Sequence, residues 1–139
     1  MKIANPTRVL FYISFGFLFL SGATFFFLDH FVRVADEWGE AQHPAQIWSL
    51  RCHGIVALWF LFLMGILWVK HIWPSLRIGR RKASGLFLLL PLLFNMLTAP
   101  ALLYLTDEDM KHWTETLHSY VGLFIIIPFA THIVFRKRN

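Results

Sequence analysis

The stretch that decides the fold lies at residues 116–135 and reads TLHSYVGLFIIIPFATHIVF. It contains no Asp, Glu, Lys or Arg, and its length matches the ~20 apolar residues that a helix needs to cross a bilayer. His118 and His132 lie near its two ends. An ionisable side chain inside a membrane is costly and usually marks a functional site. This stretch therefore predicts a membrane helix whose histidines bind a ligand.

The spacing of these two histidines places them on one face of the helix. They are fourteen positions apart, which at ~100° per residue is about 40° short of four full turns. At ~1.5 Å per residue they stand about 21 Å apart along the axis. One imidazole near each side of the membrane is the arrangement with which a helix holds two haems in series.

The rest of the chain has the composition of a membrane protein. It has 139 residues, of which 57% are hydrophobic and only 15% are charged. This excludes an ordinary soluble globule. Uncharged runs of membrane-spanning length lie at residues 9–28, 52–69, 84–106 and 116–135. We expect an all-α, integral membrane four-helix bundle that forms a single domain over residues 1–139, with spans at about 8–29, 46–72, 84–105 and 108–135.

The charges are sorted by loop. Basic residues cluster before the first run, between the second and third, and after the fourth, at Lys2, Arg8, Lys70, Arg77, Arg80, Arg81, Lys82, Arg136, Lys137 and Arg138. All eight acidic residues lie in the other two loops, at Asp29, Asp36, Glu37, Glu40, Asp107, Glu108, Asp109 and Glu115. The positive-inside bias predicts a multi-pass membrane protein with both termini in the cytoplasm. The net charge of +5 reflects this topology and not nucleic-acid binding.

The single cysteine limits the chemistry of the chain. Cys52 alone excludes an intrachain disulfide, a covalent Cys-x-x-Cys-His haem site and an iron–sulfur cluster held by this chain alone. We expect Cys52 to be a small buried residue. Any haem must then be held without covalent bonds.

The second span carries two more histidines. His53 and His71 are eighteen positions apart, five turns of a regular helix, so they are also expected to share a face. With both termini inside, His53 and His118 lie toward the outer side, and His71 and His132 toward the inner side. The sequence therefore predicts two bis-histidine haem sites, with Met64 as a weaker alternative partner for His132.

Other residues complete these predicted sites. Gly54 follows His53, and Gly122 lies one turn after His118, so both give a haem ring room near the backbone. Arg51 is positioned to pair with a haem propionate. The second span is expected to end near Trp73, where Pro74 stops it. His30, His43 and His112 lie in or beside the outer loops, where solvated roles are sufficient for them.

The fourth span and its approach, WTETLH at 113–118 with Gly122 and His132-Ile133, resemble the last haem-binding helix of prokaryotic membrane cytochromes b. That group includes the cytochrome b561-like proteins and the membrane subunits of nickel–iron hydrogenases and formate dehydrogenases. His-x13-His is the signature of the family, and His53-Gly54 looks like its second-helix ligand. The first span departs from the family pattern, because 9–28 contains no histidine. Either His71 replaces that ligand or the protein holds only the outer haem.

The resemblance implies a multi-pass protein of the bacterial inner (cytoplasmic) membrane. It also implies electron exchange between the quinone pool and a redox partner protein on the outer, periplasmic side, with this chain as the electron-transfer subunit of a larger oxidoreductase. Two alternatives stay open. One is a stand-alone enzyme of the same fold, such as a quinone-coupled superoxide oxidase. The other is a haem-free transporter or assembly protein whose histidines serve a proton or metal path.

Overall fold

The computed structural model describes residues 5–78 and 82–137. These residues are almost entirely helical, in the order α1, β1, β2, α2, η1, α3, α4, α5 and α6. The chain divides into two compact units, one ending at Trp73 and one beginning at Pro74. The expected single domain over 1–139 stays a prediction.

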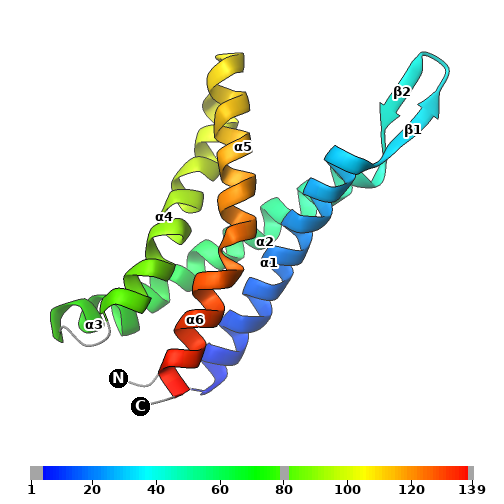
Figure 1. Ribbon diagram of the computed structural model, residues 1–139. Coiled ribbons are helices and arrows are strands. Elements are labelled where there is room, and N and C mark those ends of the chain that lie inside the picture. The colour runs from blue at the N-terminus through cyan, green and yellow to red at the C-terminus, as the bar shows by residue number, and fades with distance from the viewer. Residues whose placement is uncertain (1–4, 79–81, 138–139) are drawn as a thin grey trace. The chain divides into compact units, whose positions relative to one another are not determined.

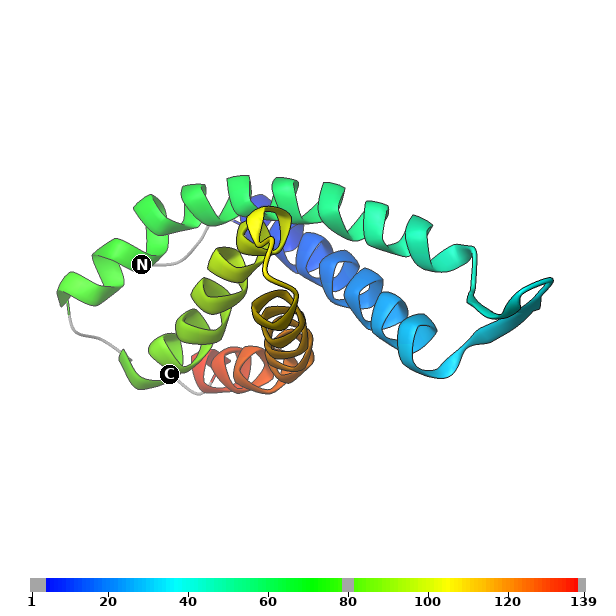
Figure 2. The ribbon, with the colours of Figure 1, turned by 90° about the horizontal axis from the view of Figure 1, so that it is seen from above.

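The first unit is a helical hairpin with a small β-hairpin at its bend. Its long helices are α1 (Asn5–Phe31) and α2 (Ala45–Leu67), and the strands β1 (Arg33–Asp36) and β2 (Gly39–Gln42) join them. Figures 1 and 2 show α1 and α2 running in opposite directions, with the β-hairpin extending beyond their shared end. The sequence predicted an irregular acidic loop in this place.

Polar and aromatic contacts fix how α1 and α2 pack. The Trp59 indole N–H donates to Ser14 Oγ at 3.1 Å, and the Phe11 and Phe60 rings pack with centroids 5.1 Å apart. Farther along, the Ser49 hydroxyl donates to the Ser21 carbonyl at 3.0 Å. In these contacts the residue number rises along α1 while the number of its partner falls along α2. The two helices are therefore antiparallel.

After the short helix α3 (Trp73–Ile78), whose first residue closes the first unit, the second unit contains three longer helices. They are α4 (Lys82–Tyr104), α5 (Glu108–Phe124) and α6 (Ile126–Lys137). The expected start of the fourth span is confirmed, because the Asp107 side chain caps α5 by accepting a hydrogen bond from the Met110 N–H at 2.8 Å. α4 is one continuous helix that contains Pro91 and Pro100. Figure 1 shows α5 alongside α4 and α6 continuing from the end of α5.

The second span differs from its prediction at its C-terminal end. After α2 the chain forms a π-helical turn, η1 (Trp68–Ile72), and then the short helix α3 (Trp73–Ile78). The expectation that Pro74 stops the helix is wrong. Pro74 falls in the first turn after the π-helical segment, where its missing N–H interrupts no regular α-helical bond.

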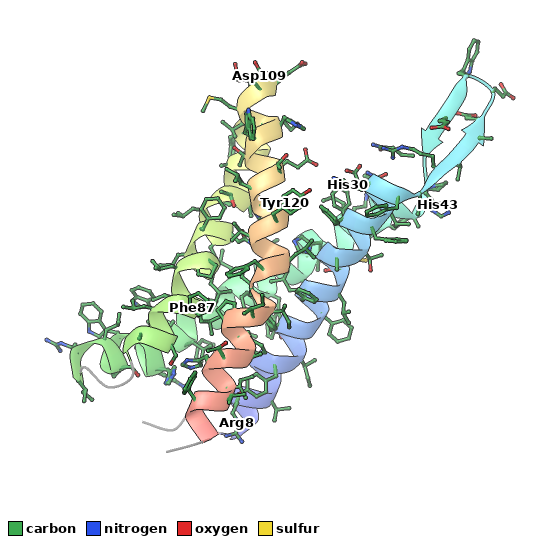
Figure 3. All side chains as sticks on the ribbon, viewed as in Figure 1. Arg8, His30, His43, Phe87, Asp109 and Tyr120 are labelled. Carbon is green, nitrogen blue, oxygen red and sulfur yellow. The ribbon has the colours of Figure 1, made fainter. Side chains whose placement is uncertain are left out.

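The all-α fold class is confirmed. Among the described residues, four helical segments are long and apolar enough to span a membrane, at Pro6–Phe31, Ala45–Ile78, Ala83–Tyr104 and Glu108–Phe135. Only 11–22% of the residues in their most apolar windows are buried. Figure 3 shows side chains projecting from the helices on all sides. Apolar surface on this scale needs lipid or other protein to cover it, so the chain is a multi-pass membrane protein.

Candidate functional site

His53 lies on α2 and is half-buried against α1. Its Nδ1 lies 3.2 Å from the Leu18 carbonyl oxygen and 3.1 Å from Ser21 Oγ. The Ser21 hydroxyl itself donates to the Leu18 carbonyl at 3.0 Å. One turn of α1 therefore holds this edge of the imidazole, through the Leu18 carbonyl and the Ser21 hydroxyl.

These contacts decide which nitrogen of His53 carries the proton. A carbonyl oxygen only accepts hydrogen bonds, so Nδ1 must donate to Leu18. In the neutral ring, Nε2 then carries the lone pair. Histidines that bind metals characteristically donate the other ring N–H to a carbonyl or carboxylate, which fixes the orientation of the ring. His53 has the tautomer that an axial ligand bound through Nε2 requires.

Two glycines adjoin this histidine in different ways. A Cβ added to Gly22 of α1 would lie 2.9 Å from His53 Cε1 and 3.2 Å from Nδ1, so only glycine leaves room for the imidazole there. By contrast, a Cβ added to Gly54 would meet nothing within 4 Å. Gly54 is exposed, and whether it leaves room for a haem stays a prediction.

His118 lies on α5 and is held by α4. Its Nδ1 is 2.8 Å from Thr98 Oγ1. The Thr98 hydroxyl also lies within hydrogen-bond distance of carbonyls of its own helix, Phe94 at 2.9 Å and Asn95 at 3.3 Å. Thr98 Oγ1 and His118 Nδ1 therefore share a hydrogen bond whose donor depends on the His118 tautomer. Both predicted outer ligands are thus held at Nδ1 by a neighbouring helix.

The surroundings of Gly122 differ from the prediction. A Cβ added to Gly122 would lie 3.0 Å from Asn95 Nδ2, so the space left by the glycine holds the Asn95 amide. Asn95 Oδ1 is buried and, among the described residues, accepts no hydrogen bond. Gly122 therefore serves the close approach of α4 to α5, and whether it also leaves room for a haem stays a prediction.

His71 lies inside the π-helical turn η1 and is half-buried. The expectation that it shares a face with His53 assumed ~100° per residue along the whole interval. A π-helical turn bonds i to i+5 and so accommodates an extra residue, which rotates the following positions relative to a regular helix. The structure therefore removes the simple geometric argument for a shared face of His53 and His71. The role of His71 as an inner ligand stays a prediction.

His132 lies on α6, beyond an interruption at Ile125. The helical bonds continue on either side, from Ile125 N to the Val121 carbonyl and from Phe129 N to the Ile125 carbonyl. Pro128 explains the interruption, because it has no N–H to donate to the carbonyl of Phe124 and its ring crowds that turn. His118 and His132 are thus carried on two helical segments that meet at this proline-induced break.

The remaining candidates have local roles. Arg51 is exposed, and its guanidinium carbon lies 5.0 Å from the centroid of the Trp48 ring. His30 stacks on Phe26, and His43 Nδ1 accepts from the Ala45 N–H at the start of α2. Figure 3 shows both of these histidines where the helices meet the β-hairpin. Cys52 is exposed, so the expectation of a buried cysteine is wrong.

Three residues of this site were not singled out from the sequence as functional. Ser21 and Gly22 lie in the first apolar span and Thr98 lies in the third, and neither of these spans contains a histidine. The available signal was that hydroxyl residues occur in the two spans that have no histidine of their own. A polar group in such a span needs a partner on another helix or in its own backbone.

Among residues 5–78 and 82–137, no group of three or more His, Cys, Asp or Glu side chains is placed to hold a metal ion. Axial coordination of a haem needs only two imidazoles, because the macrocycle supplies the other ligands. Comparison with known proteins found no family model, no curated protein and no solved structure that matches this chain.

Proposed function

We propose that this chain is a membrane b-type cytochrome that binds haem b without covalent bonds. His53 and His118 serve as the axial ligands of one haem, and His71 and His132 serve as those of a second. In this proposal the chain resembles the prokaryotic cytochromes b named above, and it is the electron-transfer subunit of a larger oxidoreductase.

The observation that carries the proposal is the shared anchoring of His53 and His118 at Nδ1. In each unit, a neighbouring helix contacts Nδ1, through Leu18 and Ser21 in one case and Thr98 in the other. Metal-binding histidines are typically held through the ring nitrogen that does not bind the metal, which fixes the orientation of the ring. Anchoring at Nδ1 therefore supports ligation through Nε2 by both histidines.

The chemistry of these donors fits haem b. Two neutral imidazoles give iron a six-coordinate environment that supports one-electron transfer and leaves no open position for oxygen. This chain orients each imidazole through its Nδ1 and surrounds the ligands with apolar spans. Arg51 is available at the same end of α2 as His53 to pair with a propionate.

The charge distribution supports the membrane topology in this proposal. Both termini and the basic loop at residues 77–82 lie in the cytoplasm, and the acidic loops lie in the periplasm of a bacterium. Electrons pass between membrane quinone and a partner redox protein on the periplasmic side. Quinone, lipid and the partner protein are the expected binding partners.

The experiment that tests this function is quinol-driven reduction in proteoliposomes. The purified chain is reconstituted, a quinol is added, and the appearance of the reduced haem band is followed with time. The proposal expects reduction by quinol and reoxidation by an acceptor added outside the vesicles. A pigment that quinol cannot reduce would contradict the coupling to quinone, and a colourless protein would favour the haem-free transporter.

A further inference from the structure

The β-hairpin at residues 33–42, called here the acidic hairpin, has no role in the haem proposal. Its strands pair antiparallel from Arg33 with Gln42 to Asp36 with Gly39. Trp38 lies in the turn and is 95% exposed. Figure 1 shows the hairpin extending past the ends of α1 and α2, away from the rest of its unit. An indole held this far into solvent needs an explanation.

The acidic hairpin is firmly mounted on the helices. At its base, the Gln46 side-chain amide donates to Asp29 Oδ1 at 2.7 Å, which ties α2 to α1. His43 Nδ1 accepts from the Ala45 N–H at 3.1 Å. Gly39 has a φ of 122°, which lets the turn close where other residues would be strained. The base of the hairpin is therefore held to both helices, and its turn carries Trp38 into solvent.

The length of the hairpin is sufficient to carry Trp38 beyond the lipid. Asp29 is the first charged residue after the first span, so we take it as the edge of the hydrocarbon. Four residues of β1 at ~3.3 Å each extend about 13 Å. The headgroup region is only about 5–8 Å deep on each side. Figure 1 shows the hairpin extending beyond the ends of α1 and α2, so its reach exceeds the depth at which tryptophans anchor proteins to membranes.

The charges of the acidic hairpin indicate which kind of partner it binds. It carries Asp36, Glu37 and Glu40 against the single basic residue Arg33. A second copy of this hairpin would bring like charges together, and anionic headgroups would repel it. A partner with basic side chains around an apolar pocket complements both the charge and the indole.

We propose that the acidic hairpin docks a water-soluble protein outside the membrane, with the Trp38 indole in an apolar pocket that lysines and arginines surround. Tryptophan is the residue type most enriched among those that dominate binding energy. Within the proposed function, this protein is the redox partner. The docking claim itself needs no haem, so the two proposals can fail separately.

The test begins with a photoreactive benzoylphenylalanine at position 38 in living cells. The matched control carries the same group at Phe17, which is 63% exposed in the middle of α1 and should reach only lipid. The docking proposal expects position 38, and not position 17, to crosslink one protein. Crosslinks to lipid or to a second copy of this chain would overturn it, and so would no product above the Phe17 control.

The crosslinked protein is then identified by mass spectrometry, purified, and titrated against the reconstituted chain. Trp38→Ala should weaken binding at least ~10-fold, and Glu37→Lys with Glu40→Lys should weaken it and remove its sensitivity to salt. The thermal midpoint of Trp38→Ala should match the wild type, because the indole is almost fully exposed. An unchanged affinity for Trp38→Ala would overturn the proposal even if the crosslink were found.

Discussion

The two predicted histidine pairs differ in the helices that carry them. His53 and His118 lie in regular helix, and each directs Nδ1 at a group on the neighbouring helix. His71 lies within the π-helical turn, and His132 lies beyond the break caused by Pro128. The first pair is held in place by backbone and hydroxyl groups, whereas the second pair is carried where the helices depart from regular geometry.

This difference has two physical interpretations that experiment can separate. A π-helical turn is frequently a functional feature, and it reorients the side chain that it carries. If His71 binds haem, the turn supplies the rotation that a regular helix would not. If His71 does not bind haem, the irregular segment reflects the membrane edge, where the span gives way to α3.

The largest effect is expected from His53→Ala and His118→Ala. Each should abolish haem binding at the first pair, because iron loses an axial ligand that the chain holds in position. Haem per chain, measured as the pyridine haemochrome, should fall by one equivalent in both variants. His112→Ala is the matched control, since His112 is exposed on the same helix as His118. Equal haem content in all three variants would remove this pair from the proposal.

The second prediction concerns His71→Ala and His132→Ala. Each should remove one haem and leave the other with an unchanged spectrum, because the remaining pair keeps both of its imidazoles. Haem per chain and the redox titration of the remaining haem measure this. A wild-type chain with a single haem that both variants retain would show that the second pair is not a haem site.

The third prediction compares two glycines of α1. Gly22→Ala should destabilise the protein by about 1–3 kcal/mol and lower its haem content, because the new methyl group meets the His53 ring. Gly16→Ala is the control, since a Cβ there meets nothing within 4 Å, and it should stabilise α1 by about 0.5–1 kcal/mol. Thermal unfolding in detergent measures both changes. The same loss in both variants would mean that Gly22 has no special relation to His53.

The smallest expected effect is on redox potential. A hydrogen bond donated by Nδ1 makes the imidazole a more basic ligand and stabilises the oxidised iron, so removing the acceptor should raise the midpoint potential. Thr98→Val should raise it by roughly 40 mV, the one-electron equivalent of about 1 kcal/mol. Ser21→Ala should have a smaller effect, because the Leu18 carbonyl still accepts from His53.

Thr98→Ser and Ser21→Thr keep the hydroxyl groups and serve as controls for this prediction. Potentiometric titration followed at the reduced haem band measures all four variants. A fall in potential for Thr98→Val, or the same shift in Thr98→Ser, would contradict the assigned hydrogen bond between Thr98 and His118.

Much of the fold could be predicted because lipid imposes a simple rule on sequence. Uncharged runs of about 20 residues predict spans, and the described helices follow them closely, including the start of α5 at Glu108. The π-helical turn at 68–72 could not be predicted, because its residues are apolar and basic like those of any span end. The acidic hairpin was also missed, since its strands are only four residues long and lack clear alternation.

For the candidate site, the histidines could be identified from the sequence but their supports could not. An ionisable residue in an apolar run stands out by itself, as His53 and His118 do. The contacts of Ser21 and Thr98 depend on how two helices pack, and no spacing within one span encodes that packing. The shared face expected for His53 and His71 depended on a uniform helix, which the π-helical turn interrupts.

The most direct test of the central claim is the spin state and quantity of haem in the detergent-purified chain. Dithionite-reduced minus oxidised spectra and low-temperature electron paramagnetic resonance provide both. We predict low-spin, bis-imidazole b haem at two equivalents per chain, and we expect His53→Ala to lose one of these two haems. High-spin haem, or no haem after reconstitution, would contradict it.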